Sequence, residues 1–125
     1  MDMGENTIRA YGERLSANDI PGIVARFTED GVLMQPDAPT AVGRQQLRAA
    51  YEYGLGLMQV NPTFTFDHFL AEGDLAVVRT HTRVSMTPRD TGVVQTLTGR
   101  ELFVLRRGGA EWRIAQYMFQ HTSAE

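Results

Sequence analysis

The chain has 125 residues, 42% of them hydrophobic, a formal net charge of −3 and no cysteine. This length predicts one domain with a single core. The lack of cysteine excludes disulfides and a cysteine nucleophile, and the scattered charges exclude a basic stripe for nucleic acid. No apolar run approaches the roughly 18–20 residues of a membrane span, and the first residues lack the pattern of a signal peptide, so we expect a cytoplasmic protein.

Two helices are predicted at the start of the chain. The first spans residues 7–17, and its apolar residues lie three or four apart on one face: Ile8, Tyr11 and Leu15. Asn18 interrupts this pattern. Asp19 is a suitable N-cap for a short second helix, which tolerates Pro21 in its first turn because the missing N–H has no intrahelical partner there.

A short strand at 31–34 and a proline-rich turn at 36–39 come next. The third helix is expected to begin after Gly43. Its apolar residues again share one face: Leu47, Tyr51 and Leu55.

The second half of the chain predicts four strands, at 62–71, 74–87, 92–106 and 111–121. Helices followed by strands indicate an α+β fold. Strands this long must twist and curl around something, and the first and third helices are long enough to fill that role. We therefore expect a cone-shaped fold, with a curved antiparallel or mixed sheet wrapped around the N-terminal helices. Tyr11 and Tyr51 would point into the same hollow.

Several short motifs occur along the chain in a recognisable order: Leu15–Phe27, Glu29–Met34, Val42–Arg44, Gly73–Ala76 and Gly109–Ile114. In this order they resemble the nuclear transport factor 2-like superfamily, and within it the SnoaL-like and ketosteroid-isomerase-like domains. The resemblance covers almost the whole chain and implies a single domain over residues 1–125. It implies no single function, because this fold serves isomerases, dehydratases, cyclases, epoxide hydrolases and non-catalytic modules.

The resemblance to ketosteroid isomerases gives Tyr11 a role. Tyr11 lies eight residues before Asp19, the spacing of the isomerase tyrosine whose hydroxyl donates to the developing enolate oxygen. The alternative is a core tyrosine bonded to a backbone carbonyl or water. The general-base aspartate of the isomerases falls at Gln35, whose amide cannot take a proton, so steroid isomerisation is not expected. Gln35 could still orient a ligand carbonyl or a water, and Asp37 is expected to be a solvated turn residue.

The second acidic donor of the isomerases falls near Glu101. If Glu101 faces the pocket, burial would raise its pKa and let it act as a proton donor. The alternative is an ion pair with Arg100 or Arg79.

Two orientations are open for the strand at 74–87. Burial favours its even-numbered residues inside, which leaves Arg79, His81 and Arg83 in solvent. The resemblance favours the odd-numbered residues inside. Arg79 and His81 would then hold a carboxylate, phenolate or enolate, and His81 would be the natural acid–base group.

In the last strand the resemblance places Tyr117 and Phe119 in the cavity. Its other face, where related proteins pair through their sheets, would carry Trp112, Ile114 and Met118. A homodimer is therefore expected. His121 is expected at the pocket mouth or on the surface.

Taken together, these features predict a pocket protein for a small apolar molecule. The leading hypothesis is a lyase, isomerase or cyclase for an apolar carbonyl compound, polyketide- or steroid-like. Its candidate catalytic residues are Tyr11, His81 and Glu101, and its candidate ligand-binding residues are Gln35, Tyr51, Arg79, Tyr117 and Phe119. No metal or cofactor is expected, because the histidines are dispersed and no phosphate loop is present. The alternatives are a binding or sequestering protein without turnover, and a protein-association module.

Overall fold

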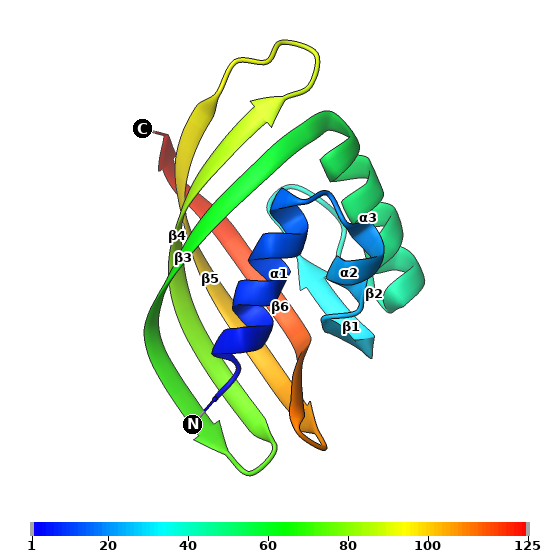
Figure 1. The fold of residues 1–125 in the computed structure, drawn as a ribbon, viewed down its shortest axis with the longest axis vertical. Coiled ribbons are helices and arrows are strands. Elements are labelled where there is room, and N and C mark those ends of the chain that lie inside the picture. The colour runs from blue at the N-terminus through cyan, green and yellow to red at the C-terminus, as the bar shows by residue number, and fades with distance from the viewer. Residues whose placement is uncertain (1, 125) are drawn as a thin grey trace.

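The computed structural model describes residues 2–124, in which three helices pack against one six-stranded sheet (Figure 1). In chain order the elements are α1 (Glu5–Ser16), α2 (Ile20–Val24), β1 (Phe27–Met34), β2 (Ala41–Val42), α3 (Arg44–Leu57), β3 (Met58–Glu72), β4 (Leu75–Pro88), β5 (Gln95–Gly108) and β6 (Glu111–Ala124).

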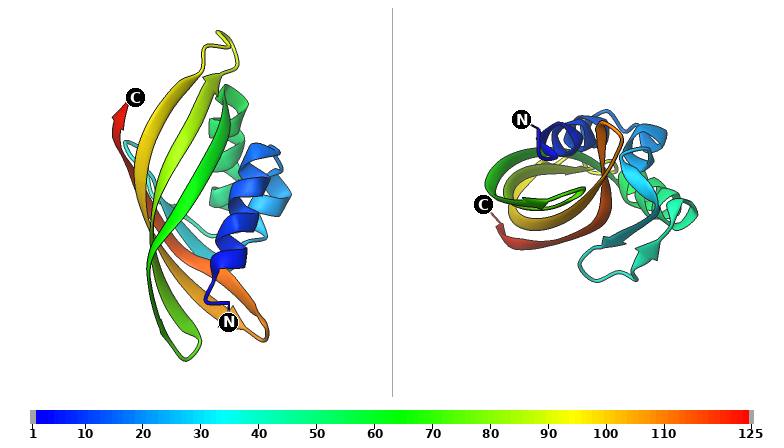
Figure 2. Two further views of the ribbon diagram at one scale, coloured as in Figure 1. Left: turned by 60° about the vertical axis from the view of Figure 1, so that its left-hand side comes forward. Right: turned by 90° about the horizontal axis from the view of Figure 1, so that it is seen from below.

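The sheet has the strand order β2-β1-β6-β5-β4-β3. It is mixed, because β1 runs parallel to β6 while every other neighbouring pair is antiparallel. Figure 2 shows the sheet curling, with the helices gathered on its concave side. The predicted α+β fold class, with a curved sheet around the N-terminal helices, is confirmed.

The helices present their predicted apolar faces to the sheet. Ile8, Tyr11 and Leu15 of α1 are buried, as are the three predicted residues of α3. The Thr7 hydroxyl donates to the Trp112 carbonyl oxygen at 2.6 Å, which ties α1 to β6. The Asp19 carboxylate accepts from the Gly22 amide at 3.1 Å, so α2 has the predicted N-cap.

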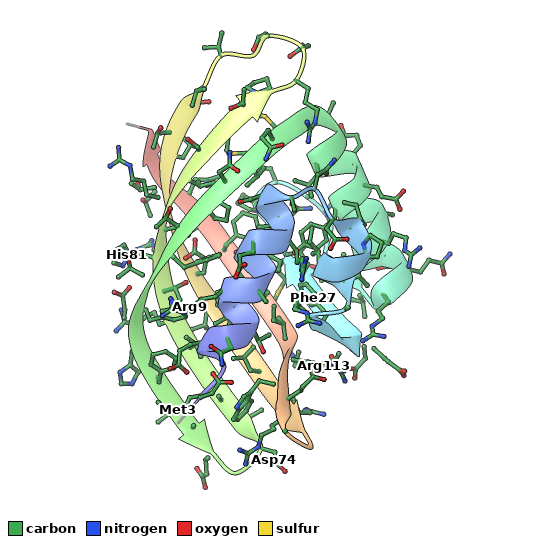
Figure 3. The ribbon with its side chains drawn as sticks, viewed as in Figure 1. Met3, Arg9, Phe27, Asp74, His81 and Arg113 are labelled. Atoms are coloured by element: carbon green, nitrogen blue, oxygen red, sulfur yellow. The ribbon has the colours of Figure 1, made fainter. Side chains whose placement is uncertain are left out.

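Strand β4 turns its even-numbered residues inward. The buried residues of this row are Ala76, Val78, Thr80, Thr82 and Val84. Arg79, His81 and Arg83 are exposed on the opposite face, and Figure 3 shows His81 on the outer side of the sheet, away from the helices. The orientation favoured by burial is therefore the one that the protein adopts, since charged side chains are costly to bury without partners.

Strand β6 differs from the prediction near its start. Leu105 pairs with Ile114 whereas Val104 pairs with Gln116, so Ala115 is an extra residue in a β-bulge. The bulge reverses the alternation of side chains. Trp112 and Ile114 are consequently buried in the core, and the expectation that they share the outer face with Met118 was wrong.

The strands are also longer than predicted at several ends. β1 begins at Phe27 rather than residue 31, and β3 begins at Met58, directly after α3. The two-residue strand β2 pairs with Val32 and Leu33 and was not predicted. Its length gives no periodicity for a sequence pattern to detect.

Candidate active site

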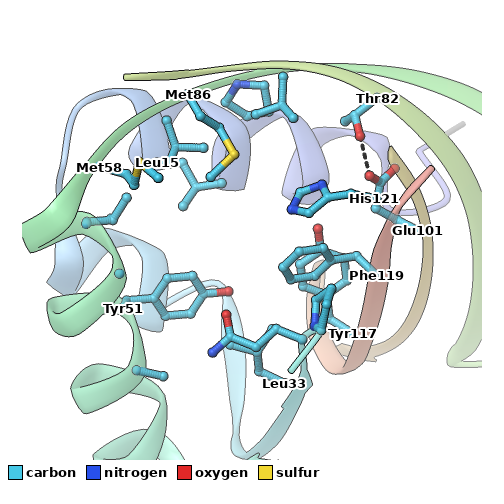
Figure 4. A pocket seen from close by; sticks show the side chains of 18 of the residues that line it. Leu15, Leu33, Tyr51, Met58, Thr82, Met86, Glu101, Tyr117, Phe119 and His121 are labelled. Atoms are coloured by element: carbon cyan, nitrogen blue, oxygen red, sulfur yellow. Dashed lines mark hydrogen bonds between the residues drawn. The ribbon is translucent and has the colours of Figure 1, made fainter. Parts of the chain in front are cut away.

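A cavity of about 340 Å³ lies between the inner face of the sheet and helices α1 and α3 (Figure 4). Its walls are mainly apolar and aromatic side chains from helices and strands: Leu15, Leu55, Val60, Phe64, Val84 and Phe119. Pockets of this size bind small organic molecules, and apolar walls favour ligands with a large hydrocarbon surface. The cavity is therefore suited to a compact, largely apolar compound.

Three tyrosines bring their hydroxyl groups together in the cavity wall. The Tyr11 hydroxyl lies 2.7 Å from that of Tyr51, and the Tyr117 ring packs edge-on against the Tyr11 ring with 5.4 Å between centroids. Burial raises the pKa of all three phenols, so each stays protonated at physiological pH. When Tyr51 donates to the Tyr11 oxygen, the Tyr11 hydrogen is left to donate to a ligand.

Glu101 is the buried carboxyl group of the cavity, only 6% exposed. Its Oε1 accepts from the Thr80 hydroxyl at 2.7 Å, and its Oε2 accepts from the Thr82 hydroxyl. Burial raises the pKa of Glu101 above its ordinary value of 4.5, while the two hydroxyl donors lower it and offset part of that rise. Glu101 is thus neither solvated nor in the expected ion pair with Arg79 or Arg100, and it can hold or release a proton.

The mouth of the cavity carries polar side chains. Gln35 lines it from the end of β1 and is partly buried, while Asp37 and His121 line it and are exposed. Asp37 has a left-handed φ of 57°, which is consistent with its predicted place in a turn. The His121 ring lies edge-on to Phe119, with 5.7 Å between ring centroids.

This geometry agrees with a comparison of sequences. The sequence profile of a SnoaL-like domain matches residues 8–117, which is most of the chain. The protein belongs to the SnoaL-like domain family. None of the curated proteins matches it in sequence.

Solved structures share the fold of this SnoaL-like protein. A ketosteroid isomerase-like protein from Erwinia carotovora atroseptica is 30% identical, with 98% of this chain and 99% of that chain covered and a TM-score of 0.89. A proposed scytalone dehydratase from Novosphingobium aromaticivorans is 17% identical, with 97% and 83% covered and a TM-score of 0.84. A proposed calcium/calmodulin-dependent protein kinase II association domain from Xanthomonas campestris is 18% identical, with 92% and 82% covered and a TM-score of 0.79. The last two likenesses show the fold alone.

Two of the predicted site residues of this SnoaL-like protein lie outside the cavity. His81 is exposed on the outer face, where its Nδ1 lies 2.8 Å from Oδ2 of Asp67. Arg79 is exposed on the same face. The expectation that they could form a polar pocket was wrong, because β4 buries the opposite row. The structure brings the other six together around the cavity: Tyr11, Gln35, Tyr51, Glu101, Tyr117 and Phe119.

Sequence reasoning did not single out Thr80 and Thr82, which hold the Glu101 carboxyl group. Their position in the inward row of β4 was the available signal, because a hydroxyl buried in a sheet needs a partner. In residues 2–124 no three histidine or acidic side chains gather in a way that could hold a metal ion. Within the same residues no helix has the length and apolar character to cross a membrane.

Proposed function

We propose that this SnoaL-like protein is an enzyme that moves protons on a small, largely apolar carbonyl compound, as an isomerase, lyase or cyclase does. One observation carries the proposal: the Tyr11 hydroxyl and the Glu101 carboxyl group line the same apolar cavity. A polyketide- or steroid-like ring system matches such walls, and its carbonyl oxygen would accept a hydrogen bond from Tyr11.

The chemistry follows from the protonation states of these groups. When Glu101 is ionised it can take a proton from the carbon beside the carbonyl, whose electron pair then forms an enolate. The protonated Tyr11 donates to the developing oxygen anion. Glu101, now protonated, returns the proton to carbon, and Gln35 orients the ligand through its amide. Once a ligand fills the cavity, the ligand and the apolar walls together exclude water and so strengthen each of these interactions.

Exchange of carbon-bound hydrogen tests this proposal directly. β-Tetralone, a two-ring ketone, is incubated with the protein in heavy water, and deuterium uptake beside the carbonyl is followed by mass spectrometry. The wild type should exchange faster than buffer. Tyr11→Phe should lose about 100- to 1,000-fold of that acceleration, the usual loss on removal of one oxyanion donor. Glu101→Gln should lose it as well.

His68→Gln is the matched control, because His68 is exposed on β3 and does not line the cavity. It should keep the wild-type rate. If the wild type binds the ketone but exchanges it no faster than buffer, the proposed enzyme function is wrong.

A second candidate function is the binding or sequestering of such a compound without turnover. The amide of Gln35 favours it, since this position holds the base in the isomerases that the sequence resembles. Tight binding of β-tetralone, with the ketone recovered unexchanged after long incubation, would favour this second function.

We also propose a homodimer formed through the outer face of the sheet. Leu102 and Met118 are paired neighbours there and are 44% and 49% exposed. Apolar side chains that adjoin on an open sheet face favour burial against a second copy.

A further inference from the structure

His121 is the single imidazole among the described residues that line the cavity. Figure 4 shows its ring projecting from β6 into the hollow. The ring packs edge-on against Phe119, at an interplanar angle of 68°, and the side chain is otherwise exposed. It therefore faces both the cavity and bulk water.

The strand register sets His121 beside Glu101. His121 pairs with Gly99, and Glu101 pairs with Phe119, so His121 and Glu101 occupy diagonal positions on neighbouring strands. Such positions lie about 7–8 Å apart in a sheet, within reach of long side chains. Both side chains line the cavity. A ligand of two rings could contact both of them at once.

Gly99, the pairing partner of His121, lies directly against the groups that hold the Glu101 carboxyl group. A Cβ atom at Gly99 would lie 2.8 Å from Oγ1 of Thr82 and 3.0 Å from Oε2 of Glu101. Any side chain at this position would push on the carboxyl group or on the hydroxyl that holds it. The absence of a side chain at Gly99 thus lets Thr82 and Glu101 fill this corner, next to the position of His121 on the neighbouring strand.

We infer that His121 is a proton-transfer residue of this cavity, acting on the same ligand as Glu101. The inference deepens the proposed function and rests on it for the identity of the reaction. Imidazole takes up and releases protons between about pH 5 and 8, which the amide of Gln35 cannot do. Its position at the mouth allows proton exchange with water, whereas Glu101 is enclosed.

With these two groups, an isomerisation can take one proton from the ligand and return one proton to it. In hydrogen exchange Glu101 both takes and returns the proton, whereas in an isomerisation His121 takes the proton from one carbon. The electron pair left behind forms an enolate whose oxygen accepts from Tyr11. Protonated Glu101 delivers its proton to another carbon of the enolate. The proton on His121 passes back to Glu101 after the product leaves. The other titratable groups that line this space are Tyr11 from α1, Asp37 from the turn after β1, Tyr51 from α3 and Tyr117 from β6, while β3 and β4 contribute none.

Nitrobenzisoxazole is a suitable probe, because one base is enough to open it. The base takes the ring C–H proton, the electron pair becomes the third C–N bond of a nitrile, and the N–O bond breaks to release a coloured phenolate. The wild type should open it faster than buffer. His121→Gln should be about 100-fold slower than the wild type, a typical contribution of a positioned base. His68→Gln should match the wild type.

The pH profile separates a proton-transfer role from a structural one. The wild-type rate should rise with pH as the base loses its proton, and His121→Gln should remove that rise. An unchanged rate and profile in His121→Gln, or a wild type no faster than His121→Gln, overturns the inference. The two proposals fail separately. A His121-dependent benzisoxazole reaction without β-tetralone exchange leaves the inference standing and refutes the proposed function, and the reverse result refutes the inference alone.

Discussion

Tyr11→Phe tests the tyrosine cluster at the level of a single bond. The change deletes the hydroxyl that lies 2.7 Å from the Tyr51 hydroxyl. It keeps the ring, which packs edge-on against Phe27 and Tyr117 with centroid distances of 6.1 and 5.4 Å. Packing is therefore conserved, and the loss of stability should come from hydrogen bonding.

The size of the loss follows from what happens to Tyr51. A buried hydrogen bond contributes about 1 kcal/mol net, and a partner left unsatisfied in a dry interior costs about 1–3 kcal/mol. Tyr51 lines the cavity, so water can replace the missing hydroxyl. We therefore expect a loss of about 1 kcal/mol, which for a chain of this length lowers the Tm by about 4 °C.

A double-mutant cycle measures the bond itself. Free energies of unfolding are obtained from urea titrations of the wild type, Tyr11→Phe, Tyr51→Phe and the double variant. The double variant should lose less than the sum of the single losses, by about 0.5–1.5 kcal/mol. Strictly additive losses would refute the hydroxyl–hydroxyl bond, and a loss above about 3 kcal/mol for Tyr11→Phe would refute a cavity open to water.

Three further predictions concern the Glu101 carboxyl group, the close packing at Gly99 and the outer face of the sheet. The raised pKa of Glu101 means that the contribution of this group to stability is fully present below about pH 4.5 and is lost as the pH rises through the folded-state pKa, so melting curves should show Glu101→Gln gaining on the wild type from pH 4 to 7; a constant difference would contradict this. Gly99→Ala should lower the free energy of unfolding by about 1–3 kcal/mol, because the added Cβ contacts Thr82. Gly54→Ala is the control: Gly54 is exposed in α3 with no atom within 4 Å of the added Cβ, and the change should raise the free energy of unfolding by about 0.5–1 kcal/mol. Equal effects of the two changes would contradict the close packing at Gly99. Leu102→Arg should convert the dimer into a monomer, as measured by light scattering. A variant that remains dimeric would place the interface elsewhere.

Periodicity was enough to predict the helices and the inner wall of the site. Ile8, Tyr11 and Leu15 are all buried on one side of α1, because the helical repeat fixes which residues share a face. The same rule predicted correctly that Tyr11 and Tyr51 face one cavity. In β4, burial alone favoured the correct orientation, while the resemblance favoured the opposite one.

The remaining features depend on pairing between strands, which one strand's own sequence does not encode. The bulges at Asp67 and Ala115 add one residue against the partner strand and shift every side chain beyond them. The first lies beside the Asp67–His81 pair on the outer face, and the second turns Trp112 into the core. That Glu101 and His121 are neighbours likewise follows from the register of β5 against β6.

The carbonyl stretch of bound β-tetralone reports whether Tyr11 donates a hydrogen bond to a ligand oxygen inside the apolar cavity. Infrared difference spectra with carbon-13 at the carbonyl separate this band from those of the protein. We expect a band at lower frequency in the wild type than in a non-hydrogen-bonding solvent. In Tyr11→Phe the band should return toward the solvent value. A bound ketone whose band is the same in both proteins would contradict it.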